Sequence, residues 1–345
     1  MTRLTKRGRA VSALGVLLLI FAVLAVPVVL WLRSLGLLLE SNPSGKVSVS
    51  IPKGASTSRI GDILEAKEVI SSALGFRIAV YTEGGLADIQ AGKYRLPTGL
   101  SAKDALEALE KGPEGPEVVQ VTFPEGSWLE EFGSIYESAT GGSADRFIEM
   151  ASSGKIRSRW QPKSIDTLEG LLFPSTYDIA VKDDETDVIQ KLVDEFDERF
   201  AAAGAQTADR LGITPYEIVI VASMIEAESR IDAERPKIAS VIYNRLEQGT
   251  PLGIDATIIY GIGERGRTLT TSDLEQDSPY NTREEVGLPP TPIGAPSEAS
   301  LEAALNPAQT DLLYYVLVDC EGNHAFSESY EEFLDNKAIY EGLEC

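Results

Sequence analysis

The sequence predicts an α+β protein in which a small module precedes a larger mixed domain. Segments with helical periodicity and short strand-like segments are mixed along the chain rather than strictly alternating, which favours α+β over a doubly wound sheet. A glycine- and proline-rich joint at 112–117 (GPEGPE) separates two groups of such segments. The 345 residues are enough for one large domain or two ordinary ones.

The first element is an uncharged apolar run from residue 11 to residue 32. It has about the 20 residues that a helix needs to cross a bilayer. Four cations and no acid precede it, so the positive-inside rule predicts a cytoplasmic tail over 1–10 and an extracytoplasmic body. We therefore expect a single-pass helix in the inner (cytoplasmic) membrane. A cleavable signal peptide is the alternative, and it places the body on the same side.

A short tether over 33–46, ending in Ser, Asn, Pro and Gly, leads to the small module, 47–111. Alternating residues predict strands, and helical spacing predicts helices. A further helix begins at Ser101 and has Gly112 as its C-terminal cap. The expected order is strand, helix, helix, strand, over 47–51, 56–67, 71–81 and 92–96.

The larger domain is expected over 118–345, because the strand pattern restarts at VVQVTFPEG and no repeat interrupts the remainder. Its clearest amphipathic helix is 187–202, with Val188, Leu192, Phe196 and Phe200 on one stripe. A strand is predicted late in the chain, at 312–318 (LLYYVLV).

The charge balance excludes one class of partner. The chain has 31 Lys+Arg and 53 Asp+Glu, and five of the cations lie in the first 33 residues. The remainder therefore holds 31 − 5 = 26 cations and 53 acids, a net charge of −27. Such a body repels phosphate backbones, so we expect no nucleic-acid partner, and it is not expected to attract acidic peptides.

Histidine and cysteine are too few for a metal centre. A single histidine, His324, excludes a multi-histidine site, and Cys320 and Cys345 exclude a cysteine-rich zinc module. We expect neither a metal nor a cofactor. Whether the two cysteines pair is left open by the sequence.

The most informative stretch is 214–230, TPYEIVIVASMIEAESR. Thr214, Pro215 and Glu217 mark a helix start, and the apolar run that follows predicts a helix buried on all sides. This helix ends in Glu226 and Glu228. Glu226 shares a face with an apolar strip, where desolvation is expected to raise its pKa toward that of a general acid. Alternatively, both glutamates are the solvated end of a core helix and face Arg230 or Arg235.

Several further segments combine polar and aromatic residues. The helix predicted over 237–246 has Asn244 and Arg245 near its end. Three segments expected as loops, 255–261, 278–282 and 287–293, place Tyr, Asn, Thr and Asp among prolines. Rigid polar loops with aromatic residues suit carbohydrate, although ordinary turn chemistry produces the same composition.

Taken together, these stretches resemble the YceG-like family of endolytic murein transglycosylases, the MltG type. The matching segments occur in the family's order from about residue 118 onward. They are LEGLLFPSTY (168–177), VASMIEAES (221–229), ASVIYNRL (239–246), DATIIYG (255–261), SPYNT (278–282), GLPPTPI (287–293), Asn306-Pro307 and GNHAFS (322–327).

The resemblance implies a membrane helix, a small LysM-like subdomain and a C-terminal catalytic domain. It implies Glu226 as the catalytic glutamate, with Glu228 as a second acid of uncertain role. Carried over in the same way, the residues in or near the glycan cleft are Asn244, Asp255, Tyr260, Tyr280 and Asn281. His324 matches a Gly-x-His-x-Phe pattern. Two departures from the family's pattern concern the rim of the glycan cleft. They are Leu252-Gly253-Ile254 before Asp255, and Ser175 where the family often has Asp.

The implied reaction cleaves the MurNAc-β-1,4-GlcNAc bond of nascent peptidoglycan strands and leaves 1,6-anhydroMurNAc ends. One carboxyl group acts first as acid and then as base, the product terminates a strand, and a peptidoglycan synthase is the expected partner. One alternative is a muramidase-type hydrolase that uses Glu226 with Glu228 or Asp255 as a carboxylate pair. Another is a membrane-tethered glycan-binding or scaffold protein whose glutamates are structural.

Overall fold

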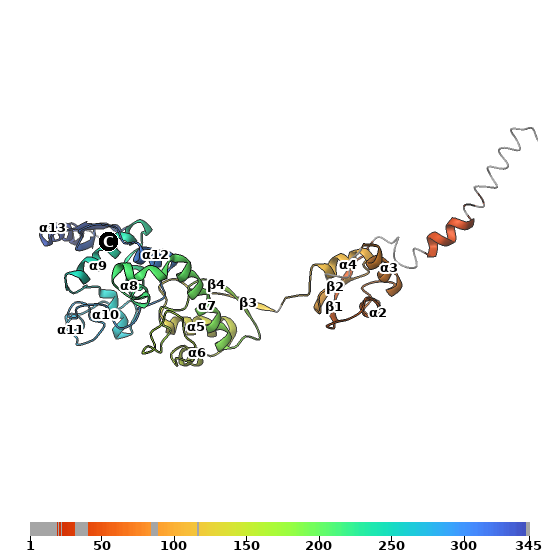
Figure 1. Cartoon of the computed structure of the whole chain (residues 1–345), viewed down its shortest axis with the longest axis horizontal. Coiled ribbons are helices and arrows are strands. Elements are labelled where there is room, and N and C mark those ends of the chain that lie inside the picture. The colour runs from red at the N-terminus through yellow and green to blue at the C-terminus, as the bar shows by residue number, and fades with distance from the viewer. Residues whose placement is uncertain are drawn as a thin grey trace, which may run out of the picture. The chain divides into compact units, whose positions relative to one another are not determined.

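The computed structural model describes residues 19, 21, 23–31, 41–83, 89–115 and 117–342 (Figure 1). The chain divides into two compact units, Met1–Pro116 and Glu117–Cys345. Of the apolar run at 11–32, the described residues are helical, and the others lie outside the described part, as do the tail at 1–10 and Cys345. Among the described residues, no helix is both long enough and apolar enough to cross a membrane.

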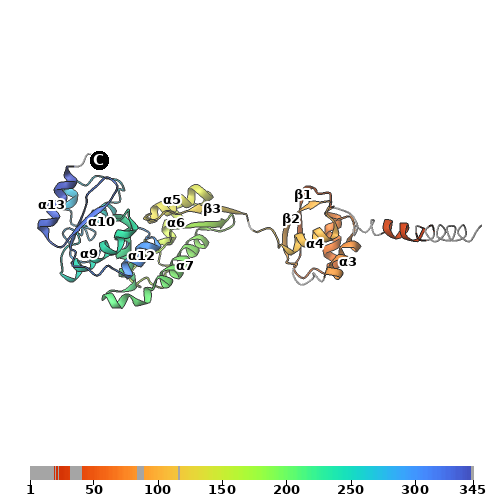
Figure 2. The same ribbon diagram turned by 90° about the horizontal axis from the view of Figure 1, so that it is seen from above.

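The first unit pairs two antiparallel strands, β1 (Ser44–Ile51) and β2 (Gly92–Thr98), with Val49 opposite Tyr94 (Figure 2). Three helices accompany them in the order that the sequence predicted: α2 (Thr57–Ala66) and α3 (Ala73–Glu83) between the strands, and α4 (Ala102–Glu110) after them. Serine side chains cap α2 and α4 at their N-termini. The hydrophobic core of this unit consists of buried side chains that include Val49, Leu64, Phe76, Tyr94 and Leu106.

The second unit begins with β3 (Val118–Thr122), which pairs antiparallel with β4 (Thr176–Ala180). Helices α5 (Leu129–Thr140) and α6 (Ala144–Ala151) lie between these strands in the chain, and α7 (Glu185–Ala203) follows. The predicted stripe on α7 is confirmed, because its four apolar residues are all buried in the core. A short 3-10 helix, Ala205–Leu211, then leads to the central helix.

That central helix is α8 (Pro215–Glu228), and its prediction is confirmed. The Thr214 side chain accepts from the Glu217 amide, while the Thr214 amide donates to the Glu217 carboxylate at 2.6 Å. Tyr216 and residues 218–225 are all buried. Around α8 lie α9 (Arg235–Glu247), α10 (Asp255–Ile262) and α12 (Glu298–Leu305) (Figure 1).

The remaining elements are α11 (Thr271–Leu274), the antiparallel pair β5 (Tyr314–Leu317) and β6 (His324–Ser327), and α13 (Tyr330–Glu341). The prediction of a loop at 255–261 was wrong, because this segment forms α10. Thr257 and Ile258 are buried inward-facing residues, and Gly263 ends the helix with φ +79°. Packing of these residues decides the conformation, which the short DATIIYG segment does not reveal by itself.

Candidate active site

The C-terminal end of α8 carries Glu226 and Glu228, which have different surroundings. Successive helical residues are about 100° apart, so residues two apart project toward nearly opposite sides. Glu226 meets α9 and α12, whereas Glu228 meets β5. The fold therefore places two neighbouring acids in two separate environments.

The Glu226 carboxylate lies among hydrogen-bond donors. It accepts from Arg235 Nη1 at 3.1 Å, from the Ser297 amide at 3.0 Å and from Ser300 Oγ at 2.8 Å, and also from Ser297 Oγ. The side chains of Glu226 and Arg235 are only 9% and 8% exposed, so this ion pair is buried. The expectation of an apolar surrounding was wrong, because the groups that reach the carboxylate come from α9 and α12 rather than from its own helix face.

A turn before α5 approaches the same carboxylate. The Gly126 amide donates to Ala295 O at 2.8 Å, and the Ala295 amide donates to Ser127 O at 2.9 Å. A Cβ atom on Gly294 would lie 2.8 Å from Gly126 O, so only glycine allows this approach. Partial burial, and then the charge of Glu226, raise the pKa of the neighbouring Glu125 carboxyl. Glu125 was not among the residues singled out from the sequence, although it follows a strand in a Pro-Glu-Gly turn.

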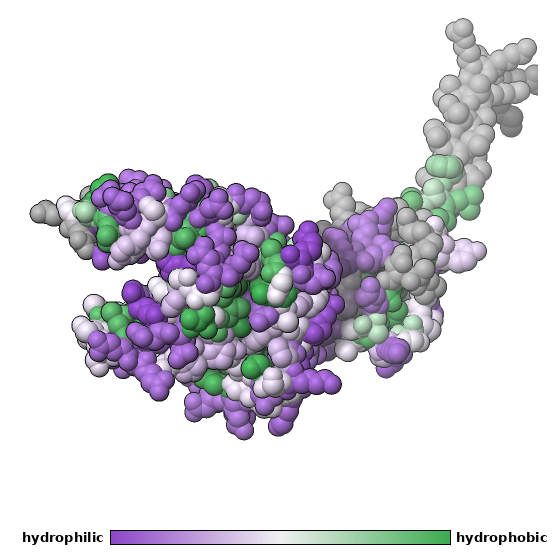
Figure 3. Space-filling model, turned by 60° about the vertical axis from the view of Figure 1, so that its left-hand side comes forward, coloured by the Kyte–Doolittle hydropathy of each residue, from purple (hydrophilic) through white to green (hydrophobic). Residues whose placement is uncertain are grey.

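Glu228 lines a cavity of about 710 Å³. Figure 3 shows a deep groove in this face of the second unit, between the part that carries α13 and the part that carries α10 and α11. The cavity is lined from both sides of that groove: α13 supplies Tyr330 and Phe333, and α10 begins with Asp255. The end of α8 thus contributes Glu228 directly to a solvent-accessible hollow.

The environment of Glu228 favours its protonated form. Burial raises the pKa of the Glu228 carboxyl, and the negative charge of Asp255 adds to this rise. Tyr315 Oη donates a hydrogen bond to Glu228 Oε2 at 3.2 Å, which opposes it. A carboxyl group that keeps its proton at higher pH than usual is suited to act as a general acid.

Aromatic rings form one wall of this cavity. Tyr314 lies 5.4 Å from Phe333 and 5.8 Å from Tyr330, measured between ring centroids, and Tyr330 and Phe333 are 5.7 Å apart. Tyr330 is 58% exposed. The exposed face of Tyr330 offers an apolar surface to the flat side of a sugar ring.

His324 also lines the cavity, and a carboxylate holds it in place. Its Nδ1 lies 2.7 Å from Glu234 Oε2, and its backbone amide donates to Glu234 Oε1 at 3.0 Å. The imidazole meets the Tyr315 ring edge-on, with centroids 5.4 Å apart. The sequence left the role of His324 open, and the structure places it beside the tyrosine that contacts Glu228.

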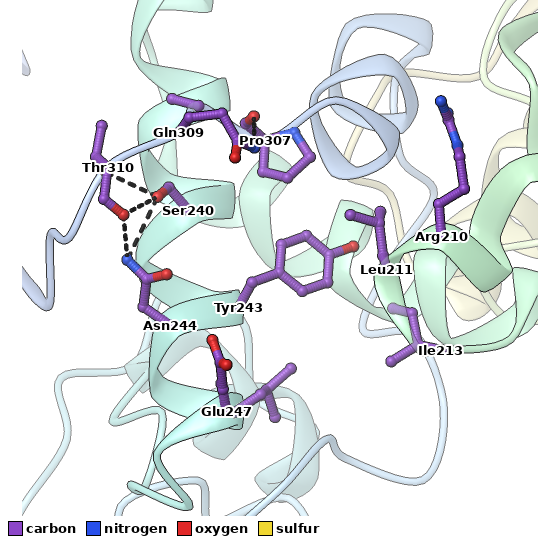
Figure 4. A pocket seen from close by; sticks show the side chains of 12 residues that line it. Arg210, Leu211, Ile213, Ser240, Tyr243, Asn244, Glu247, Pro307, Gln309 and Thr310 are labelled. Atoms are coloured by element: carbon purple, nitrogen blue, oxygen red, sulfur yellow. Dashed lines mark hydrogen bonds between the residues drawn. The ribbon is translucent and has the colours of Figure 1, made fainter.

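Asp255 is the other residue of the predicted glycan cleft that lines the cavity. Its carboxylate pairs with Arg283 at 2.7 Å. Asn244 lies elsewhere: its Nδ2 donates to Thr310 O and Leu312 O at 2.8 Å, beside a second cavity of about 540 Å³ (Figure 4). Asn244 thus joins α9 to the segment before β5.

The three remaining predicted cleft residues are held in internal contacts. Tyr260 Oη donates to Glu169 Oε2 at 3.0 Å, and its ring packs 5.2 Å from that of Tyr280. Tyr280 Oη lies 2.8 Å from Thr291 Oγ1. The buried Asn281 donates to two backbone carbonyls of the 274–276 segment. These three residues make contacts inside the unit and do not line the cavity around Glu228.

Glu169 is a buried carboxyl that the sequence did not mark. Burial raises its pKa to about 8, although the Leu129 amide and Tyr260 Oη both donate to it. It lies within the LEGLLFPSTY segment, but the residues around an acid in an apolar run do not reveal which distant groups will donate hydrogen bonds to it. Within the part of the chain that the structure describes, no group of three or more His, Cys, Asp or Glu residues could hold a metal ion.

A protonatable carboxyl beside an aromatic wall is an arrangement that suits a glycan-cleaving enzyme. The chain belongs to the YceG-like family, whose pattern matches residues 49–339.

An endolytic murein transglycosylase of Bacillus subtilis (strain 168) is 31% identical over 314 residues, which cover 87% of this chain and 86% of that protein. An endolytic murein transglycosylase of Streptococcus pneumoniae (strain D39) is 28% identical over 331 residues, and the match spans 59% of that longer protein. The crystal structure of a YceG-like protein from Listeria monocytogenes is similar, with a TM-score of 0.58 and 29% identity, over 86% of this chain and 100% of that one.

Proposed function

We propose that this protein is an endolytic murein transglycosylase that cleaves MurNAc-β-1,4-GlcNAc bonds within glycan strands and leaves 1,6-anhydroMurNAc ends. Family membership and two relatives that bear this name support the activity. The cavity supports it physically, because it combines a carboxyl of raised pKa with an aromatic wall.

The observation that carries the mechanism is the position of Glu228 in that cavity. We propose Glu228 as the acid and base, in preference to Glu226. The protonated Glu228 gives its proton to the leaving glycosidic oxygen as the bond to C1 breaks. The resulting carboxylate then takes the proton of the C6 hydroxyl of the same MurNAc as that oxygen attacks C1, which closes the anhydro ring and restores the acid. Atoms balance without a water nucleophile.

Glu226 remains the second candidate, because the family resemblance led to it. Its carboxylate is buried against Arg235 and two serines, which leaves it little access to a substrate oxygen. We propose that it positions the site by joining α8 to α9 and to the start of α12. The approach of the Gly126 turn to Glu226 connects the same region to α5.

A muramidase-type hydrolase is the rival that one observation favours. Glu228 and Asp255 line the same cavity, and two carboxylates are what hydrolytic glycosidases require. Asp255 is paired with Arg283, so it would have to be released before it could activate water. The products distinguish the two reactions, because hydrolysis leaves a reducing MurNAc.

The cellular setting is part of the proposal. The uncharged run at 11–32 supports a single-pass membrane anchor with the active unit outside the cytoplasm. The β–α–α–β order of the first unit supports a LysM-like glycan-binding role. An anchored endolytic enzyme would act on nascent strands, so we propose strand termination beside a peptidoglycan synthase.

The test compares the full chain with its Glu228→Gln and Glu226→Gln variants on uncrosslinked glycan strands, with products identified by mass spectrometry. Anhydro-ended internal fragments from the wild type and from Glu226→Gln, but not from Glu228→Gln, support the proposal. Loss in Glu226→Gln alone, with an unchanged melting temperature, reverses the assignment. Reducing ends indicate a hydrolase, and strand binding without cleavage indicates a glycan-binding scaffold.

A further inference from the structure

The cavity around Glu228 collects cations in a unit that is otherwise strongly acidic. Among its described lining residues, four are cations and two are acids: Arg230, Arg245, Arg283 and Lys337 against Glu228 and Asp255. The body of the chain carries a net charge of −27 (26 − 53), so this local excess is opposite in sign to the average surface. When Glu228 holds its proton, the excess is larger still.

Two of these cations are not neutralised by the acids of the cavity. Arg245 is held by backbone carbonyls, at 2.7 Å from Leu313 O and 2.6 Å from Leu252 O, and its guanidinium lies over the Tyr314 ring at 5.2 Å. Carbonyl oxygens satisfy its N–H groups but do not cancel its charge. Arg230 is exposed, lines the same cavity and has its aliphatic stem near Gly322. No ion pair among the described residues includes either arginine.

We propose that Arg230, supported by the positive potential of Arg245, forms a subsite for the carboxylates of the stem peptide on the MurNAc that is cleaved. The inference rests on the proposed function. MurNAc differs from GlcNAc by the lactyl ether that carries this acidic peptide. A guanidinium in the same cavity as Glu228 therefore distinguishes the two sugars and fixes which glycosidic oxygen faces the acid. Arginine suits this task because its planar fork binds carboxylates in two places.

The experiment measures binding in the Glu228→Gln background, with uncrosslinked strands that either retain their stem peptides or have had them removed by an amidase. The readout is the ratio of the two dissociation constants at low and high salt. We expect peptide-bearing strands to bind about fivefold more tightly at low salt, the upper range for an exposed ion pair. High salt should reduce this preference.

Adding Arg230→Ala should bring the ratio to about one, and Arg230→Lys should restore part of it. Arg210→Ala is the matched control, because Arg210 is an exposed arginine at the second cavity (Figure 4), and its ratio should equal that of the parent. An unchanged ratio in Arg230→Ala, or equal binding of both strands by the parent, overturns the subsite.

The two proposals fail separately. Cleavage to anhydro ends by the wild type without any peptide preference leaves the proposed function in place and removes this inference. A peptide preference that depends on Arg230, in a protein that cuts neither kind of strand, keeps the subsite and removes the activity.

Discussion

The two sides of the C-terminal end of α8 place the same functional group, a glutamate carboxyl, in different environments. On one side, Glu226 is surrounded by a guanidinium and serine donors, and its charge is matched within the protein. On the other, Glu228 meets one tyrosine hydroxyl and an open cavity, and burial makes its charge unfavourable. A matched buried charge is suited to holding elements together, whereas an unmatched carboxyl is suited to exchanging a proton.

The largest expected effect separates the two sides by activity. Glu228→Gln should lower the rate of anhydro-product formation by about 10²–10⁴-fold, the usual contribution of a general acid and base. Glutamine keeps the size of the side chain, so the melting temperature should change little. The rate is measured by chromatography of the released fragments. Residual activity within tenfold of the wild type would remove Glu228 from the proposed role.

The next largest effect distinguishes the two sides of α8 by the free energy of unfolding. Arg235→Ala leaves the buried Glu226 carboxylate without its cation, and loss of one partner from a buried pair costs about 3–5 kcal/mol. Urea unfolding of the full chain measures this loss. Arg230→Ala, which removes an exposed arginine, is the control and should change the free energy of unfolding by less than about 0.5 kcal/mol. Equal effects of the two substitutions would mean that the Glu226 pair does not stabilise the unit.

A third buried glutamate extends the comparison to pH. Glu169 keeps its proton in the folded state up to about pH 8, whereas in the unfolded chain it ionises near 4.5. Between these pH values the unfolded state binds fewer protons than the folded state. The contribution of Glu169 to stability is therefore full below about pH 4.5 and falls as the pH rises toward 8, by about 1.4 kcal/mol per pKa unit at most.

Unfolding curves at several pH values test this, with Glu169→Gln as the comparison. In the Glu169→Gln variant, the free energy of unfolding should not show this decline between pH 4.5 and 8. A wild-type curve that rises across this window, with the variant parallel to it, would contradict the prediction.

The smallest effect is a shift in a pH profile. Activity requires protonated Glu228 and should fall as the pH rises through its raised pKa. The Tyr315 hydrogen bond lowers that pKa, so Tyr315→Phe should move the alkaline limb of kcat/KM to higher pH. A shift of this limb to lower pH, or none, would show that Tyr315 does not act on the catalytic carboxyl.

Much of the architecture could be read from local patterns. The α8 start depends on Thr214, Pro215 and Glu217, which lie within one turn, and the stripe on α7 recurs at helical spacing. The loop expected at 255–261 became α10, because eight residues with a weak periodicity are decided by what they pack against. The choice between Glu226 and Glu228 could not be made from spacing, since the groups that decide it, Arg235, Ser297 and Tyr315, lie 9 to 87 positions away.

The sequence by itself determined the order of elements, the acidic charge of the body, the buried helix with two terminal glutamates and the resemblance to a family, because each of these is a local or summed property of the chain. Only the tertiary structure decided which glutamate meets a cation and which meets a cavity, and it gathered arginines around Glu228 within an acidic protein. The reason is physical: pKa values and local potential depend on burial and on charges a few ångströms away, and the fold brings those charges from distant parts of the chain.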